Sequence, residues 1–390
     1  MILKRSPLQC FYMLPTASRH LLWLLLIIVS VIITRVCIIV WFSALTPGGL
    51  AGVLAGHDGV DYLAYADAVS RFDLASIPDS ARRVNPGWPF LIGTIRIALP
   101  FVPVWVIAWV LMTASFAGAL LLYDKMLTRL NFDASARLRA VFAFGFAYPT
   151  LLYFQSFALV DSILLLLIIA CMCAWQSKRF VLSAVLLSCA TCVRLPVFLL
   201  GIAQLAADFY FHRSMGTKRE QIRRVVLLGL ALVLPGLLLL LCKSVWGSST
   251  IGLYSPKIGL PLSGLDGISE VSTIRALYIL LAVSFFVVSA IIYVRRFVSS
   301  QRTPFNLFAS IYTVFFILFH LSLKRLLYEG SMIPLFNYQD RYYVALLPFC
   351  LLPWLRFLSW RVLMVLTGVS IVLTCYWGKN YFHTLLALTN

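Results

Sequence analysis

Charged residues are scarce in this sequence. They occupy 12% of its 390 positions, whereas hydrophobic residues occupy 62%. A soluble globular domain carries about 25% charged residues, so the composition excludes an ordinary soluble enzyme. Several apolar runs are long enough to cross a bilayer, and backbone groups inside lipid must be satisfied by helices or closed barrels. Because alternating barrel-type strands are absent, the sequence predicts an all-α, polytopic integral membrane protein.

The sequence also lacks the usual signatures of bound cofactors. No glycine-rich phosphate loop follows a strand, and the five histidines are scattered without partners at metal-ligand spacing. Cys189 and Cys192 have a CxxC spacing, but no further ligands lie nearby, and the cysteines of the apolar runs are typical of core packing. We therefore expect no metal and no cofactor. No internal repeat is visible, so an inverted-repeat transporter has no support.

The amino terminus carries Lys4, Arg5 and Arg19 ahead of an apolar run of about 24 residues. This run is too long for the core of a signal peptide and lacks a small-residue cleavage site. It is therefore interpreted as a retained first helix.

Apolar stretches divide the chain into a single transmembrane domain, 1–390, with about 10–11 spans. The stretch Trp88–Leu99 is short and is expected to lie at the membrane interface. The segment 180–211 is interrupted at Arg194-Leu195-Pro196, where proline breaks a helix, so it is predicted as a broken helical hairpin. The remaining predicted spans are 21–44, 100–123, 138–153, 157–175, 225–242, 273–294, 304–323, 342–358 and 361–378.

The net charge of +18 would suggest nucleic acid as a partner of a soluble protein, but here its distribution predicts topology instead. If the amino terminus is cytoplasmic, the inside segments hold 19 of the 32 lysines and arginines, and nine of the fourteen acidic residues fall outside. This asymmetry predicts a multi-pass protein of a cytoplasmic (inner) membrane with its carboxyl terminus outside. The inside segments are 1–20, 124–139, 176–180, 212–224, 295–303 and 356–361.

The first outer loop, 45–99, is the longest polar segment. Five of the fourteen acidic residues lie in its stretch 56–90. A run of apolar residues at helical spacing predicts an amphipathic helix at the membrane surface, formed by Tyr62, Leu63, Ala66 and Val69. Asp58 would precede this helix, either as a helix cap or as a catalytic carboxylate, and Asp61 follows one turn later.

Several arginines are candidates for binding an anion. Arg83 lies in the pair that closes the outer loop and could bind an anion or contact lipid phosphates, the second being the favoured interpretation. Arg194 stands at the break of an apolar hairpin, where a charged side chain usually faces a cavity or a partner. Arg341 could pair with Asp340, anchor the chain at the interface or clamp a phosphate. Asp161 could pair with Arg194 or with the intramembrane Arg35, for which a structural pairing is the favoured interpretation.

Four short motifs occur in a recognisable order: His57-Asp58-Gly-Val-Asp61-Tyr62, then Asn85-Pro86-Gly87-Trp88-Pro89, then "LLSCATCVRLPVFLL" with Arg194, then Arg341 before an apolar span that contains Pro348. In this order the chain resembles the GT-C superfamily of multi-pass glycosyltransferases, most closely PIG-V-type mannosyltransferases and their bacterial relatives. The resemblance is best over the first 210 residues. It departs from the family at His57 and Asn85, which replace aromatic residues, and at Leu195-Pro196, which replace Ser-Asn.

The resemblance implies an inverting transfer of a sugar, a hexose such as mannose, from a polyprenyl-phosphate donor to a lipid or glycan acceptor. It implies that Asp58 acts as the general base at the outer face of the membrane. Asp61, Arg83, Arg194 and Arg341 would bind the substrates, with the arginines stabilising the phosphate that leaves. Membrane lipids complete the expected partners, without nucleic acid.

Three other functions remain open at the level of the sequence. A lipid or sugar-lipid transporter would use the intramembrane arginines to line a path. A non-catalytic membrane scaffold would need Asp58 and Arg194 only for stability. A membrane acyltransferase is a weaker hypothesis, because His320 has no paired motif.

Overall fold

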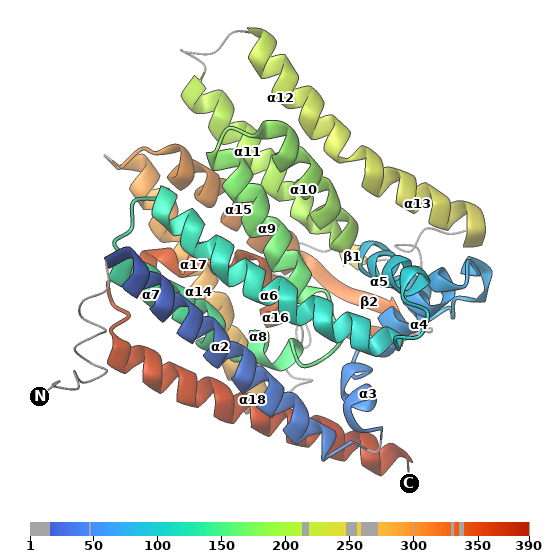
Figure 1. Ribbon diagram of the computed structural model, residues 1–390. Coiled ribbons are helices and arrows are strands. Elements are labelled where there is room, and N and C mark those ends of the chain that lie inside the picture. Colours follow the sequence, from blue (N-terminus) through green and yellow to red (C-terminus); the bar gives the residue numbers. More distant parts are fainter. Residues whose placement is uncertain are drawn as a thin grey trace, which may run out of the picture.

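The computed structural model describes residues 16–46, 48–212, 218–246, 256–258, 272–299, 301–328, 331–334 and 339–389. Helices dominate this part of the chain (Figure 1). Six of its helical stretches are long and apolar enough to cross a membrane. Their outward faces carry large exposed apolar side chains, such as Leu25, Leu240 and Val365. The predicted architecture, a polytopic helical membrane protein, is therefore confirmed.

The six long stretches are formed by seven helices, because α12 and α13 together supply one of them, Ile222–Val245. In Figure 1, α2 and α18 run alongside each other, and α12 and α13 follow one outer edge of the molecule. The seven helices are α2 Thr16–Ser43, α6 Val104–Arg129, α12 Lys218–Ala231, α13 Val233–Trp246, α14 Thr273–Val298, α15 Pro304–Leu321 and α18 Trp360–Thr389.

Three predicted spans are not single helices, since 225–242 is already divided between α12 and α13. The span 138–153 is divided into α7 (Ala134–Phe146) and α8 (Pro149–Phe154). The span 342–358 is a series of short turns: α16 Gln339–Tyr342, η7 Tyr343–Leu346, α17 Leu347–Cys350 and η8 Leu352–Trp354. Pro149, Pro348 and Pro353 each lie in the first turn of one of these short helices, and proline removes a backbone donor and clashes with the preceding turn. Hydropathy predicted the burial of these segments but not their interruption.

Helix α9 (Asp161–Gln176) lies at the centre of the bundle, between α6 and α10 (Phe180–Val193). Leu164, Leu165, Ile168 and Ile169 of this helix are fully buried, whereas Ile163, Leu166 and Leu167 are partly exposed. After α10, Arg194 adopts an extended conformation, and the chain continues through η3 (Leu195–Val197) into α11 (Phe198–His212). The segment 180–211 is thus two short helices that meet at Arg194.

The segment 45–99 contains three α-helices, which are α3 Gly49–Leu54, α4 Gly59–Ser70 and α5 Gly87–Ala98, and two short 3-10 helices, η1 Leu74–Ser76 and η2 Ala81–Arg83. Tyr62, Ala66 and Val69 are buried, and α4 packs against α5, η2 and α6. Gly93 of α5 packs so closely that an added Cβ would lie 2.6 Å from Val69. The apolar face of α4 therefore packs against protein, and the position of this helix at the membrane surface stays a prediction.

A small antiparallel sheet joins segments that are distant in sequence. Its order is β1 (Pro256–Ile258), β2 (Leu323–Tyr328) and β3 (Ser331–Pro334). Strand β2 directly follows α15, and the predicted span 304–323 ends at the first residue of this strand, Leu323. The strand itself was not predicted. The sheet is a minor addition to the helical architecture.

Candidate active site

Four charged side chains form one connected series, which we name the charged chain: Asp58, Arg341, Asp161 and Arg194. Asp58 Oδ2 lies 3.3 Å from Nη1 of Arg341. Arg341 Nε lies 3.5 Å from one oxygen of Asp161, and Arg194 Nη1 lies 3.5 Å from the other. Three of the predicted site residues are thus brought together, with Asp161 as the carboxylate that bridges the two arginines.

Accessibility distinguishes the members of the charged chain. The side chains of Asp161, Arg341 and Arg194 are 1%, 7% and 9% exposed, whereas that of Asp58 is 42% exposed. Two carboxylates balance two guanidinium groups, which satisfies the requirement that buried charges be paired. Asp58 is therefore the carboxylate that a substrate can reach.

Asp58 is positioned by a tight turn between α3 and α4. An added Cβ on Gly56 would lie 2.6 Å from the Phe157 ring, and one on Gly59 would lie 2.2 Å from the carbonyl oxygen of Leu54. Asp58 occupies the N-cap position of α4, but its side chain makes no capping hydrogen bond. The carboxylate contacts Arg341 instead, which argues against the simpler hypothesis that Asp58 only caps a helix.

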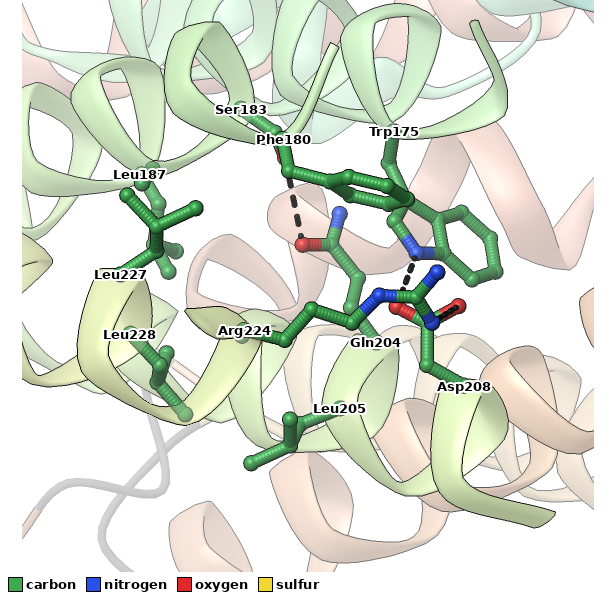
Figure 2. Close-up of a pocket in the computed structure, with 12 residues that line it drawn as sticks. Trp175, Phe180, Ser183, Leu187, Gln204, Leu205, Asp208, Arg224, Leu227 and Leu228 are labelled. Atoms are coloured by element: carbon green, nitrogen blue, oxygen red, sulfur yellow. Dashed lines mark hydrogen bonds and ion pairs between the residues drawn. The ribbon is translucent and has the colours of Figure 1, made fainter. Parts of the chain in front are cut away.

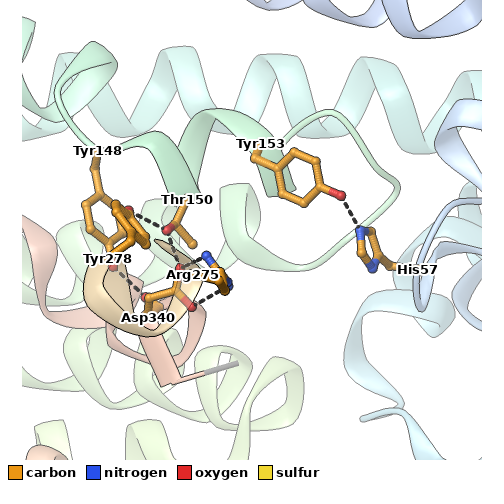
Figure 3. A network of polar contacts seen from close by, with 7 residues as sticks. All are labelled: His57, Tyr148, Thr150, Tyr153, Arg275, Tyr278 and Asp340. Atoms are coloured by element: carbon orange, nitrogen blue, oxygen red, sulfur yellow. Dashed lines mark hydrogen bonds and ion pairs between the residues drawn. The ribbon is translucent and has the colours of Figure 1, made fainter. Parts of the chain in front are cut away.

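His57 fixes this turn among aromatic rings. Its backbone is left-handed, with φ of 53°. Its backbone N–H donates to the Tyr381 hydroxyl at 2.7 Å, and its Nε2 lies 2.8 Å from the Tyr153 hydroxyl (Figure 3). The imidazole stacks on Tyr381 at 4.1 Å between ring centroids. Burial and the positive charge of Arg341 lower the pKa of His57 to about 3, so the ring is neutral.

Asp161 and Arg194 come from two helix ends. Asp161 is the first residue of α9, where the helix dipole favours a negative charge. Arg194 is the extended residue that ends α10, and its guanidinium carbon lies 5.3 Å from the centre of the Tyr342 ring. The predicted alternative, an Asp161–Arg35 pair, is wrong. Arg35 donates to the carbonyl oxygen of Gln155 at 3.1 Å and thereby supports the loop that leads into α9.

Arg341 lies in α16, next to Tyr342, and its guanidinium carbon is 4.8 Å from the centre of the Phe154 ring. Burial alone would lower the pKa of Arg341, but the carboxylates of Asp161 and Asp58 raise it above its ordinary value. The guanidinium therefore stays charged. Burial and the nearby Asp58 also raise the pKa of Tyr62, whose hydroxyl stays protonated.

Asp340 does not pair with Arg341. It is fully buried and accepts two hydrogen bonds from Arg275, at 2.9 and 3.0 Å (Figure 3). Thr150 donates to the same carboxylate at 2.5 Å, and the Tyr148 hydroxyl donates to the Asp340 carbonyl at 2.6 Å. These contacts anchor α16 to α8 and α14, and so they hold the backbone from which Arg341 extends.

The second motif of the sequence packs beside the charged chain. Gly87 starts α5 against the backbone of Cys192, where an added Cβ would lie 2.7 Å from the carbonyl carbon, two residues before Arg194. Trp88 is fully buried, and its indole N–H donates to the carbonyl oxygen of Ala158 at 3.3 Å. The end of the 45–99 segment therefore supports the loop before α9 and the end of α10.

The two remaining predicted residues have different outcomes. Asp61 lies one turn along α4 from Asp58 and is 4% exposed, so it is much less accessible than Asp58. Arg83 is the last residue of η2, and the prediction for its side chain lies outside the described part of the structure. Its neighbour Arg82 forms an ion pair with Asp79 at 2.7 Å, which is a contact within the same loop.

Sequence reasoning did not identify Arg275 or Tyr381. Arg275 lies in the first turn of α14 and Tyr381 near the end of α18. Both act through contacts with residues far away in the chain, and neither carries a local motif. Within the described ranges, no group of three or more His, Cys, Asp or Glu residues could hold a metal ion.

Comparison with known proteins gives no relative from which a function could be transferred. No family model, no curated protein and no solved structure matches this chain.

Proposed function

We propose that this protein is a GT-C-type glycosyltransferase. It moves a hexose, such as mannose, from a polyprenyl-phosphate donor to a lipid or glycan acceptor. The observation that carries the proposal is the charged chain, in which Asp58, Arg341 and Arg194 meet although they lie in three distant segments. A reachable carboxylate beside buried guanidinium groups is the combination that transfer from a phosphate donor requires.

Asp58 is the general base of the proposed reaction. The acceptor hydroxyl gives its proton to the Asp58 carboxylate, while its oxygen forms a bond with the anomeric carbon of the donor. The bond from that carbon to the phosphate oxygen breaks on the opposite side, and the electron pair leaves with polyprenyl phosphate. The configuration at the anomeric carbon is inverted.

The two arginines stabilise the leaving phosphate. As Asp58 accepts the proton it loses its charge, and its attraction for Arg341, 3.3 Å away, weakens. At the same moment the leaving phosphate gains negative charge. Arg341 can then interact with the phosphate, while Asp161 holds both Arg341 and Arg194 in place. Charge balance in the buried site is thus kept throughout the step.

The proposal places this site at the outer face of a cytoplasmic membrane. A cysteine at Ser76, in the loop of the site, and one at Ser299, after α14, serve as reporters in a background without native cysteines; both native side chains are exposed. An impermeant thiol reagent added to intact cells should label position 76 and not position 299. The reverse pattern would invert the orientation.

The decisive experiment measures sugar transfer by the purified protein. Mass spectrometry of glycolipids from cells with and without the protein first identifies the missing sugar and its acceptor. Transfer from the matching polyprenyl-phosphate donor is then compared for wild type and Asp58→Asn, which should be about 10²–10⁴-fold slower. Asp67→Asn is the matched control, because it makes the same change on α4 at an exposed i,i+4 pair with Arg71.

Each outcome has a distinct meaning. A folded Asp58→Asn protein with the wild-type rate removes Asp58 from the mechanism. If Asp61→Asn alone is inactive, the base is Asp61. If the wild-type protein moves labelled lipid from one leaflet of a vesicle bilayer to the other but forms no glycosidic bond, the glycosyltransferase proposal is wrong. A transporter is then the better interpretation.

A further inference from the structure

A second polar region lies at the other end of α9. The carboxyl ends of α6, α9 and α14 and the start of α15 surround a cavity of about 480 Å³, which we name the basic cavity. Its cationic side chains are Arg129, Lys178 and Arg296. They come from three of the segments that the positive-inside rule assigned to one side, 124–139, 176–180 and 295–303. These three positively charged segments therefore lie close together around one cavity.

The positive charge of the basic cavity is not neutralised by its walls. Lys178 and Arg296 make no ion pair with any residue in the described ranges, and Arg129 donates to the carbonyl oxygen of Cys173. Asp208 is the one acidic residue that lines the cavity. Its carboxylate lies 3.3 Å from Arg224 and accepts a hydrogen bond from the Trp175 indole at 3.1 Å (Figure 2). Asp208 is thus balanced by its own partners.

The neutral lining suits an amphiphile. Gln176 contributes a buried side-chain amide whose nitrogen and oxygen have no hydrogen-bond partner among the described residues. Asn306 adds a second amide, whereas Phe132, Phe305 and Leu352 provide apolar walls. A volume of about 480 Å³ lies within the range of small-molecule sites, which is roughly 300–1,000 Å³. The cavity therefore combines three cations, polar amides and an apolar surface.

We propose that the basic cavity binds the phosphate headgroup of an anionic membrane lipid. Arginine and lysine side chains contact phosphate oxygens through charge-assisted hydrogen bonds, and the amides bind the remaining polar atoms. The cavity lies at the ends of helices that are long enough to cross the membrane, which places it at the level of the lipid headgroups. The acyl chains of the bound lipid then lie along the apolar wall of the cavity. Since α9 has 16 residues, the basic cavity is about 24 Å from the charged chain. The proposal does not depend on the glycosyltransferase function.

The binding experiment uses three soluble probes and the purified full-length protein. These probes are dioctanoyl-phosphatidylglycerol, dioctanoyl-phosphatidylcholine and inorganic phosphate, each titrated while the thermal unfolding midpoint and tryptophan fluorescence are recorded. Phosphatidylglycerol should bind at least about tenfold more tightly than the other two. Equal binding of phosphatidylcholine would show that the headgroup charge is not recognised. Equal binding of inorganic phosphate would replace the lipid with a free anion.

Variants test whether the basic cavity is the binding site. Lys178→Gln and Arg296→Gln should each raise the dissociation constant for phosphatidylglycerol about tenfold, because each removes one charged contact. The matched controls Arg179→Gln and Arg302→Gln remove neighbouring exposed charges that do not line the cavity, and they should leave binding unchanged. If the controls weaken binding as much, the effect is general electrostatics and the proposal is wrong.

Folding is controlled in the same series. Lys178 is exposed, so Lys178→Gln should keep the unliganded unfolding midpoint of wild type. Arg296→Lys should keep most of the affinity, because it retains the charge. Wild-type affinity in both Lys178→Gln and Arg296→Gln, with normal folding, would exclude the cavity as the lipid site.

Discussion

Asp161 is the residue whose loss should disturb the charged chain most. It is 1% exposed and lies 3.5 Å from both Arg194 and Arg341. Asp161→Asn keeps the shape of the side chain but leaves one carboxylate opposite two buried guanidinium groups. Each ion pair is worth about 4 kcal/mol at an effective dielectric constant of 20, before desolvation is counted. Removing one partner of a buried pair typically costs about 3–5 kcal/mol, and we expect a loss of that size in the free energy of unfolding.

A second substitution separates charge from packing. Asp161→Asn with Arg194→Met leaves Asp58 opposite Arg341, so the site is neutral again. The double variant should therefore be more stable than the sum of the single variants predicts, by about 1–3 kcal/mol. Asp67→Asn is the control, since its exposed pair with Arg71 should contribute less than about 1 kcal/mol.

Unfolding in mixed micelles with increasing dodecyl sulfate, followed by tryptophan fluorescence, measures these differences. Two results would refute the reasoning. One is an Asp161→Asn protein within about 1 kcal/mol of wild type. The other is a double variant whose loss equals the sum of the two single losses, because this would mean that Asp161 and Arg194 do not interact.

Three further predictions follow from contacts around the site. Arg275→Gln should lower the free energy of unfolding by about 3 kcal/mol, because it leaves the buried Asp340 without its guanidinium, and Arg275→Lys should restore only part; denaturation of both variants checks this. The depressed pKa of His57, about 3 against 6.5 when unfolded, gives stability that is complete above pH 6.5 and is lost as the pH falls toward 3. Wild type should lose about 1–2 kcal/mol more than His57→Phe between pH 6.5 and 5, and equal losses would assign the effect to other groups. Gly59→Ala should reduce sugar transfer and the melting temperature together, since its Cβ would lie 2.2 Å from the Leu54 carbonyl oxygen; unchanged values would mean that the turn can move.

Much of the helical architecture could be predicted because hydropathy reports burial and lipid contact directly. The exact helices could not, because a proline such as Pro149 or Pro348 changes backbone hydrogen bonding without changing hydropathy. The apolar side chains of α4 show the opposite problem. Their spacing predicted a buried face correctly, but spacing does not distinguish a protein partner from lipid.

Residues of the candidate site could be predicted where a charged residue interrupts or borders an apolar segment. Arg194 and Arg341 were identified in this way, and Asp58 through its motif. The partner of Asp161 was left open between two arginines, because only packing decides which guanidinium lies closer. Arg275 carries no such signal. Arg275 contacts Asp340, which lies 65 residues away in the chain, and no local sequence motif near either residue predicts this contact.

The order in which the charged chain is synthesised has a consequence for biogenesis. Arg341 follows Asp58 by 283 residues, so at about 5–20 residues per second the ribosome delivers it roughly 15–60 s later. From the synthesis of Arg194 until that of Arg341, the nascent protein contains Asp58, Asp161 and Arg194, with one carboxylate in excess. The amino-terminal helices therefore cannot form an electrically complete unit on their own. Chains that end before Arg341 keep this excess charge, so the charged chain becomes neutral only when the carboxyl-terminal quarter of the protein has packed against the amino-terminal helices.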